Sequence, residues 1–399
     1  SLDLRFRLDP RPERASKDIL IIAIDDGSLN YAREELGQGW PWPRVFYAVI
    51  TDYLRSSGAA ATVFDLSFEE ADFLRGDIDS EASDQGFASA LQNSPGCVLP
   101  LTFTHYATPA DSLELIPPLE ALDKLPASNW QGVKPPYPPF AAVAGGFGGI
   151  NLLSSDDATV RKVPLLYRWN SRTYPNLALA ALLSSPREHP LKSRPETFLR
   201  SLPLSQDGEL HLNWYGKGGA GGAFTYIPFS RLLASAVQAS RGERPAIAPE
   251  TFRDQYVIIG SAASGMLDLK ASPYDWGIPG MEIWATGLSN LLEEDFLRFP
   301  AGFSTFLLLF LLSFLVLVAV ARLKASLSPL VVLGLLLLFS LGTFIVFRDQ
   351  RLVLNYSSLL LVWVSSWIGI LTLSYFMEGR TKQELKQIFD SYLHPALVD

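Results

Sequence analysis

Cysteine is almost absent from this sequence of 399 residues, in which Cys97 is the only one. A single cysteine excludes an intrachain disulfide, so the fold must be held together by its hydrophobic core. Histidine is also scarce, and its few positions have none of the spacings of a metal site. No Ser/His/Asp order, HExxH motif or pair of catalytic carboxylates is recognisable, so these residues give no positive evidence for catalysis. The histidines are His105, His189, His211 and His394.

Charge is scarce as well, and positive charge most of all. Charged residues make up 19% of the chain, below the ~25% of a typical soluble domain. Residues 1–299 carry 26 Lys and Arg against 36 Asp and Glu, a net charge of −10. Proteins that bind nucleic acids need basic surfaces, so the acidity of this region argues against a nucleic-acid partner.

What the sequence does contain is three long apolar runs near its C-terminus. Residues 301–321, 326–347 and 352–377 have no charged side chain over 21, 22 and 26 positions. A helix of ~20 apolar residues is long enough to cross the hydrocarbon core of a bilayer. Links of only four residues join the runs, which favours three transmembrane helices over three buried core helices. Membrane lipid is therefore an expected partner.

The basic residues beside these runs predict an orientation. Arg322 and Lys324 lie in the first link, and the tail after residue 377 is also basic. The positive-inside rule places both in the cytoplasm, so residues 18–299 form an extracytoplasmic domain of a multi-pass protein of the cell (inner) membrane. Such a domain needs an export signal, and residues 1–17 contain none. We expect residues 1–17 to connect to an upstream span, and residues 378–399 to lead to a further cytoplasmic domain.

Residues 18–299 have the pattern of an α/β domain. Short apolar runs predict buried strands at 18–25, 60–66, 96–101 and 256–260, with helices between them. This alternation predicts a mainly parallel sheet covered on both faces. Residues 148–153 and 163–169 predict an added hairpin, which makes the sheet mixed. The helices are expected at 43–54, 83–91, 174–183, 229–240 and 281–294, and a Pro-rich loop at 107–139.

Polar side chains follow three of the predicted strands. Because ligands gather beyond the carboxyl ends of parallel strands, these side chains are candidates for a ligand-sensing crevice, with Asp25, Asp65 and Asp268 close to one another and to Arg44. Asp and Ser also cap helices and brace turns, so a purely structural role is the alternative. The candidates are Asp25, Asp26, Ser28, Asp65, Ser67, Ser261, Ser264 and Asp268.

The segment Trp40-Pro41-Trp42-Pro43-Arg44 adds two further candidates. Trp and Arg are common binding anchors, so Trp40 and Arg44 are considered for ligand binding, with Arg44 paired to Asp25 or Asp65. The two prolines stiffen the segment, and a structural brace is the alternative.

Two other motifs resemble known sites only in part. The acidic stretch 77–81 lacks the Gly and Glu positions of a calcium loop, and we expect a solvated loop. The glycine-rich stretch 216–222 suggests a phosphate cradle, but no Ser or Thr follows Lys217 and a strand is expected next. We therefore expect a flexible hairpin loop there, and no metal site in this chain.

Several segments together resemble a known family. IIAIDDGSL, GWPWPR and GAAATVFDLSF are similar to the opening of the extracellular CHASE sensor domain of type 2, and residues 256–292 resemble its end. GGINLLSSDDATVRKVPLLY resembles its middle hairpin, and three short spans follow as is usual in the family. The sequence departs from the pattern at Trp284-Ala285, where His-Ala is typical, and at Asp157-Ala158, where Asp-Gly is usual.

The resemblance also implies an activity beyond this chain. Family members end in a nucleotidyl cyclase, a histidine kinase or a Ser/Thr kinase. FDSYLHPALVD resembles the segment leading into class III adenylate cyclases, with its aromatic, proline and valine positions at Phe389, Tyr392, Pro395 and Val398. A receptor adenylate cyclase is therefore expected, which converts ATP to cyclic AMP and pyrophosphate with Mg or Mn in a catalytic domain outside these residues. A kinase receptor and a non-catalytic membrane binding protein are the alternatives.

The polar tail predicts a helix that pairs with a second copy. Its apolar residues recur on one face, and a helix leaving the membrane has little of its own chain to cover them. Pairing in a homodimer would cover this stripe. The membrane surface or the expected catalytic domain could cover it instead. The stripe consists of Leu385, Ile388, Phe389, Tyr392 and Leu393.

Overall fold

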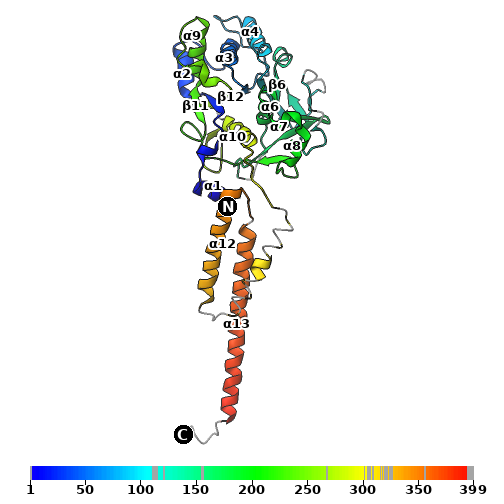
Figure 1. The fold of residues 1–399 in the computed structure, drawn as a ribbon, viewed down its shortest axis with the longest axis vertical. Helices are drawn as coiled ribbons and strands as arrows, with labels where there is room; N and C mark the ends of the chain where they lie inside the picture. Colours follow the sequence, from blue (N-terminus) through cyan, green and yellow to red (C-terminus); the bar gives the residue numbers. More distant parts are fainter. Residues whose placement is uncertain are drawn as a thin grey trace. The chain divides into compact units, whose positions relative to one another are not determined.

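The computed structural model describes residues 2–109, 116–119, 122–153, 157–266, 268–300, 327–354 and 356–392, with scattered positions between 302 and 322. The chain divides into two units (Figure 1). Residues 6–297 form the first, called the large unit here. Residues 1–5 and 298–399 form the second, called the helical unit.

The centre of the large unit is a seven-stranded sheet. Its strands run in the order β11-β1-β12-β2-β3, and every neighbouring pair in this series is parallel. β6 also pairs in parallel with β3, and only β5 is antiparallel. The predicted mainly parallel sheet is thus confirmed. The strands are β1 (Ile19–Ile24), β2 (Ala61–Asp65), β3 (Cys97–Thr104), β5 (Gly132–Lys134), β6 (Gly146–Gly149), β11 (Thr225–Pro228) and β12 (Tyr256–Ser261).

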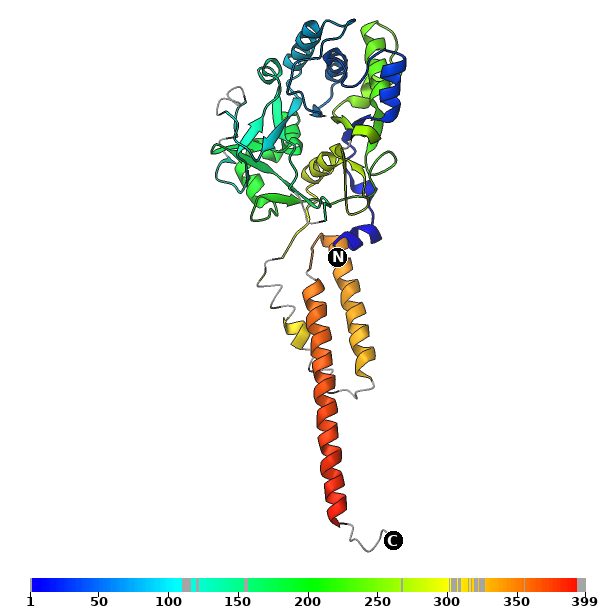
Figure 2. The same cartoon turned by 180° about the vertical axis from the view of Figure 1, so that it is seen from behind.

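Helices cover both faces of this sheet, because its central strands are apolar on both sides. All six residues of β1 and of β12 are buried, as expected of parallel strands between two helical layers. One layer comprises α2 (Asp26–Glu34), α3 (Arg44–Ser56), α4 (Ser80–Gln92) and α9 (Phe229–Ser240), which pack on one another. The other comprises α6 (Leu177–Ser184) and α10 (Met281–Leu292), as seen from behind in Figure 2.

The predicted hairpin between residues 148–153 and 163–169 is wrong. β6 joins the main sheet instead, and a Cβ on Gly148 would lie only 2.5 Å from Leu177 Cα, so its glycines serve close packing under α6. The actual hairpin pairs β8 (Leu166–Trp169) with β9 (Arg172–Pro175). Asn170 and Ser171 turn it with positive φ angles of 50° and 62°, the geometry that tight hairpins prefer.

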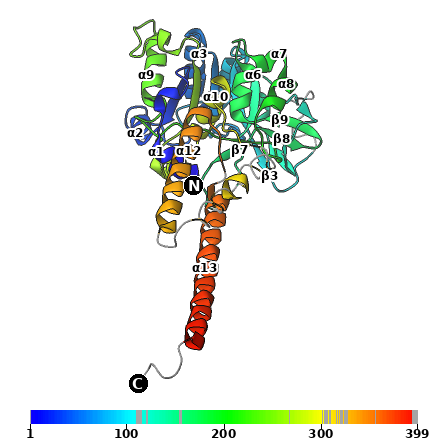
Figure 3. The same cartoon turned by 60° about the horizontal axis from the view of Figure 1, so that its bottom comes forward.

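The remaining elements of the large unit are small. β4 (Ser128–Asn129) pairs with β8, β7 (Lys162–Pro164) with β10 (Glu209–His211), and β13 (Leu269–Lys270) with β14 (Ile278–Pro279). Figure 3 shows α7 (Pro190–Ser193) and α8 (Pro195–Ser201) beside α6, away from α2 and α9. The predicted loop at 107–139 contains β4, β5 and the start of α5 (Pro138–Ala141). The sequence prediction missed α2.

A buried polar cluster ties the beginning of the large unit to its last helix. The backbone N–H of Ser16 donates to Ser289 Oγ at 2.9 Å, and this hydroxyl donates to the phenol of Tyr215 at 3.1 Å. The side chain of Asn290 bonds both backbone groups of Asn213, accepting from its N–H at 2.8 Å and donating to its carbonyl at 3.1 Å. The segment at Ser16, near the start of the large unit, is therefore hydrogen-bonded to α10, near the end of the unit.

The helical unit contains α12 (Ser328–Gln350) and α13 (Tyr356–Tyr392). Among the described residues, one helix is long and apolar enough to cross a membrane, Pro329–Gln350, and it corresponds to the predicted span 326–347. The predicted span 301–321 lies mostly outside the described residues. The predicted span 352–377 overlaps α13 from residue 356 onward, and the apolar helical stretch there, Trp363–Thr372, is shorter. The described residues thus contain one candidate membrane helix, and not the three predicted.

Two segments of the helical unit that precede and separate the predicted spans are paired. The N–H of Arg298 donates to the carbonyl of Arg351 at 2.8 Å, and the N–H of Val353 donates back to Arg298 at 2.8 Å. The guanidinium of Arg5 donates to the carbonyl of Leu354 at 3.0 Å. The chain around Arg298 thus lies beside the link between the second and third predicted spans. Helix α1 (Leu2–Leu8) begins the chain.

Candidate functional site

A cavity of about 790 Å³ opens at the carboxyl edge of β2 and β12, where the parallel sheet predicts a ligand site. It is formed by strand ends, by the segment after β6, by β13 and by the first turn of α10. Its lining residues are Asp65, Leu66, Ser67, Ile150, Leu152, Leu153, Ala158, Val160, Ser261, Met266, Asp268, Lys270, Gly280, Ile283 and Trp284. Four of the predicted strand-end residues therefore share one cavity: Asp65, Ser67, Ser261 and Asp268.

Asp65 holds its place because α10 approaches the sheet closely. It ends β2 and is the register partner of Gly260 on β12. A Cβ on Gly260 would lie 2.9 Å from Met281 and 3.3 Å from the Cβ of Asp65, closer than packed carbon atoms allow. The glycine thus lets the first turn of α10 reach the strand end. This contact brings Trp284 to the carboxyl group of Asp65.

The surroundings of Asp65 favour its neutral form. Burial of the carboxyl group, reinforced by the charge of Asp268, raises the pKa of Asp65 to about 7. A hydrogen bond from the Trp284 indole and the charge of Lys270 act in the opposite direction and are outweighed. Asp65 therefore titrates near neutral pH, in a position that faces the cavity.

Asp268 is compensated more fully than Asp65. The ammonium of Lys270 lies 3.2 Å from its carboxylate. A Cβ on Gly280 would be 2.7 Å from Asp268 Oδ2, so the carboxylate rests against the residue before α10. The backbone N–H of Gly280 also donates to the carbonyl of Asp268 at 2.9 Å. A negative charge is favourable at the N-terminus of a helix, where backbone N–H groups are left over.

The remaining strand-end candidates brace the fold and are not among the described residues that line the cavity. Asp25 caps α2, accepting from the N–H of Ser28 at 2.7 Å. Ser28 Oγ accepts from the N–H of Ser230 at 3.1 Å and ties α2 to α9. Asp26 accepts from Ser264 Oγ at 3.1 Å. Asp25 therefore serves as a helix cap and, unlike Asp65 and Asp268, is not among the described residues that line the cavity.

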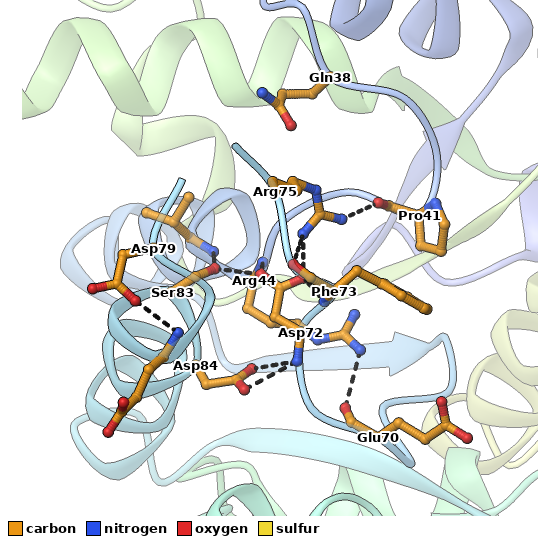
Figure 4. A network of polar contacts seen from close by, with 12 residues as sticks. Gln38, Pro41, Arg44, Glu70, Asp72, Phe73, Arg75, Asp79, Ser83 and Asp84 are labelled. Atoms are coloured by element: carbon orange, nitrogen blue, oxygen red, sulfur yellow. Dashed lines mark hydrogen bonds and ion pairs between the residues drawn. The ribbon is translucent and has the colours of Figure 1, made fainter. Parts of the chain in front are cut away.

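Arg44 also differs from the prediction, since it pairs with neither Asp25 nor Asp65. It opens α3 behind Pro43, which offers no side-chain cap, so the helix end is capped from other elements. The N–H of Arg44 donates to Asp72 at 2.9 Å, and the N–H of Val45 donates to Ser83 Oγ at 3.0 Å (Figure 4). The guanidinium lies 4.9 Å from the ring centre of Phe68.

Asp72 is the centre of this network. It accepts from Ser83 Oγ at 2.6 Å and from the Arg75 guanidinium at 2.5 Å, while its N–H donates to Asp84 at 3.0 Å (Figure 4). Burial alone would raise the pKa of Asp72, but the hydrogen bonds from Ser83 and the Arg44 N–H and the charge of Arg75 lower it below its usual value. Ser83 thus serves α3. The cap of α4 is Asp79, which accepts from the N–H groups of residues 81 and 82.

Trp40 lines a second, smaller hollow of about 460 Å³ together with Arg44 and Phe73. Its side chain is 40% exposed and makes an edge contact with Trp42, with the ring centres 5.3 Å apart. Leu66 and Ser67 line both hollows, so the loop after β2 separates them. Trp40 and Arg44 are therefore near neighbours of the main cavity but not part of its lining.

The glycine-rich stretch 216–222 does surround an anion, but one from the chain itself. The N–H of Gly219 donates to both carboxylate oxygens of Glu282, at 3.2 and 3.1 Å. A Cβ on Gly218 would lie 2.3 Å from Glu282 Oε2. Burial raises the pKa of Glu282 to about 7, against the opposing hydrogen bonds from Gly219 and Tyr226. The loop is thus packed against an internal carboxylate on α10.

The acidic stretch 77–81 is exposed at Asp77, Asp79 and Glu81, as expected of a solvated loop, and two of its carboxylates also make structural hydrogen bonds. Asp77 accepts from the Gln38 amide at 2.5 Å, and Asp79 caps α4. Within the part of the chain that the structure describes, no group of three or more His, Cys, Asp or Glu is arranged to hold a metal ion.

Sequence reasoning did not propose two polar members of the cavity lining, Lys270 and Trp284. Lys270 gave no signal, because isolated surface lysines are common. Trp284 did give a signal, because the sequence has Trp284-Ala285 where the family typically has His-Ala.

The pairing stripe is described only in part. Leu385 and Ile388 lie on α13 and are 51% and 56% exposed. The side chains of Phe389 and Tyr392, and all of Leu393, lie outside the described residues, as do Pro395 and Val398.

Comparison with known proteins gives one family. The model of the CHASE2 domain matches residues 1–320 of the chain. No curated protein and no solved structure matches.

Proposed function

We propose that this chain, which belongs to the CHASE2 domain family, is the sensor and membrane portion of a receptor-type adenylate cyclase. CHASE2 is an extracellular sensor domain found in receptor-type signalling proteins. The finer proposal is that the large unit binds a signal outside the cell. The helical unit then passes the change to a cyclase domain that converts ATP to cyclic AMP and pyrophosphate.

The position of the cavity is the observation that carries this proposal. Ile283 and Trp284, in the first turns of α10, form part of its lining. α10 ends at Leu292 and is the last helix before the apolar segments begin at residue 301. A ligand in the cavity would therefore touch the element that is directly continuous with the membrane part of the chain.

Three membrane spans are part of the proposal, and the helical unit supports their order. In an arrangement of three spans, the start of the first and the link between the second and third lie on the same side. The backbone pairing of Arg298 with Arg351 supports this order, because it brings these two segments together. The cell (inner) membrane is the proposed location.

The cyclase assignment rests on the sequence from residue 389 onward, where Phe389, Tyr392, Pro395 and Val398 resemble the entry to a class III cyclase. A CHASE2 receptor kinase would have the same sensor, and it is the alternative. No residue of this chain is proposed as catalytic, and the Mg or Mn ion would be held by the cyclase domain itself.

The test uses the full-length receptor in membranes supplied with ATP and Mg. Ser67→Trp places an indole at the rim of the cavity, and Ser240→Trp is the control at the exposed end of α9. We expect cyclic AMP production to change at least twofold in Ser67→Trp and to stay unchanged in Ser240→Trp. Equal output from both variants would contradict a sensory role for the cavity. Protein phosphorylation without cyclic AMP would establish the kinase alternative.

Homodimer formation through α13 is proposed with this function. Leu385 and Ile388 present exposed apolar side chains three residues apart on the helix, which suits pairing with a second copy. Leu385→Cys and Ile388→Cys should each give disulfide-linked dimers in membranes. Normal expression with no dimer at either position would refute the paired helix.

A further inference from the structure

We infer that the cavity beyond β2 and β12 binds a small amphipathic amine, a protonated nitrogen joined to a short apolar chain or ring. This inference rests on the proposed sensory function and adds the chemical class of the signal.

The first argument is an imbalance of charge. Two carboxylates line the cavity, and Lys270 is the only cation among its described lining residues. Lys270 is already paired with Asp268, at 3.2 Å. Asp65 forms no ion pair among the residues that the structure describes, and its neighbour Trp284 offers only a neutral N–H. A partly buried carboxylate without a countercharge is unfavourable, so a cation that enters the cavity would form with Asp65 the ion pair that no described residue of the chain provides.

The second argument is the division of the walls. One carboxylate and two hydroxyls come from the ends of β2 and β12 and the residues just after them, at Asp65, Ser67 and Ser261. A large apolar contribution comes from the segment after β6. Its members are Ile150, Leu152, Leu153 and Val160. Such a site suits a ligand with one charged end and one apolar end, and about 790 Å³ lies in the range of small-molecule pockets.

Other ligand classes fit less well. An anion would meet two carboxylates, and Lys270, the one cation among the described lining residues, is engaged. A metal ion would find only two acidic side chains here, and no group of three ligands exists among the described residues. A polyol could bond to Asp65 and the serines, but it would leave four apolar side chains in contact with hydroxyl groups.

Proton release distinguishes an amine from a neutral ligand. The charged groups that face Asp65 are Asp268, before β13, and Lys270, on β13, while α10 contributes the neutral indole of Trp284. Because the pKa of Asp65 is raised to about 7, part of this carboxyl is protonated at pH 6.5. An ammonium group beside it stabilises the ionised form and so expels the proton. An alcohol of the same length has no such effect.

The experiment is titration calorimetry of the whole chain in lipid nanodiscs at pH 6.5, with hexylamine, hexanol and hexanoate as probes. Two buffers of different ionisation enthalpy report the protons released. We expect hexylamine to bind at least tenfold more tightly than the other two and to release protons. Asp65→Asn should remove both effects. Asp207→Asn, at an exposed carboxylate away from the cavity, should keep both.

A second variant covers the case in which Asp65→Asn fails to fold. Ser67→Arg adds a cation at the exposed rim, leaves Asp65 in place, and should weaken hexylamine at least tenfold while leaving hexanol unchanged. Equal binding of hexanol and hexylamine, or undiminished amine binding in both variants, would overturn the amine class. The cyclic AMP test with Ser67→Trp decides the sensory function separately, so either proposal can fail while the other stands.

Discussion

Asp65 ends β2 and Asp72 lies seven residues later, in the loop between β2 and α4, yet their surroundings are opposite. Asp72 is bonded by a helix N–H, a serine and an arginine, and its pKa is lowered. Asp65 has one neutral partner, and its pKa is raised to about 7. The difference indicates a separate role for each carboxylate. Asp72 holds three elements together, whereas Asp65 has no countercharge among the described residues and lines a cavity that a ligand can reach.

Glu282 adds a third case to this comparison. Its pKa is also raised to about 7, but two hydrogen bonds from Gly219 and close packing against Gly218 enclose it. A raised pKa therefore does not identify a binding site by itself. Access to a cavity distinguishes Asp65 from Glu282.

The largest expected effect comes from removing the structural acid. Asp72→Ala leaves the N–H of Arg44, the hydroxyl of Ser83 and the guanidinium of Arg75 without their acceptor. We expect a loss of about 3–4 kcal/mol in the free energy of unfolding, as for other buried networks that lose one partner. Thermal unfolding of the purified chain measures it, with Asp207→Ala as a control.

The pH dependence sharpens this result. The pKa of Asp72 is lowered by folding, so its stabilisation is present above the unfolded pKa of ~3.9 and is lost as pH falls through the folded value. The difference between the wild type and Asp72→Ala should shrink below about pH 4. A difference that is the same at every pH would mean that the charge of Asp72 is unimportant.

The second effect has the opposite sign. Because the pKa of Asp65 is raised to about 7 in the folded state, its contribution to stability falls as pH rises from ~4 to about 7. Asp65→Asn should therefore be more stable than the wild type at pH 8, by about 2 kcal/mol after allowance for partial exposure. The gain should narrow at pH 5. A loss of stability at pH 8 would show that Asp65 serves the fold as Asp72 does.

A smaller effect tests the enclosed acid. Gly218→Ala places a Cβ 2.3 Å from Glu282 Oε2 and 2.4 Å from Ile278 Cγ2. We expect a loss of about 1–2 kcal/mol from overpacking, measured by thermal unfolding. Gly216→Ala in the same loop meets only Pro12 at 3.9 Å and is the matched control. Similar unfolding of both variants would mean that the loop yields freely around Glu282.

The smallest effect concerns the cavity rim. Ala158 lines the cavity with φ +56°, at the position where the family usually has glycine. Ala158→Gly should stabilise the chain by about 0.5–1 kcal/mol, because glycine adopts this conformation without steric strain. Unfolding midpoints of the two proteins measure the gain. A loss of stability would indicate that packing of the alanine methyl group stabilises the chain more than the positive φ angle of Ala158 destabilises it.

The sequence predicted the sheet because its strands are continuous apolar runs, as in DILIIAID and YVIIG. Residues at the ends of those strands were found for the same reason, and Asp65 and Asp268 do share a cavity. The prediction could not separate them from Asp25, because helix capping and ligand binding use the same residue types. Asp25 acts as a cap because an N–H group in the first turn of α2 lies within hydrogen-bond distance of it.

The errors arose where long-range packing decides the structure. The hairpin at 148–153 failed because its glycines make room for Leu177, a contact that no local pattern reveals. Arg44 was assigned to the wrong acids because its partner, Asp72, lies in a loop without regular periodicity. Trp284 entered the site through the close approach of α10 to Gly260, which depends on two segments more than twenty residues apart.

The bonds that Ser16 and Asn213 make with Ser289 and Asn290 have an evolutionary consequence. When the start and the end of a domain lie close together, the domain can be inserted into a host chain, or removed from it, without separating the host's own segments. Recombination could thus join one such sensor to many different output enzymes, and the output could change its chemistry while the recognition domain kept its architecture.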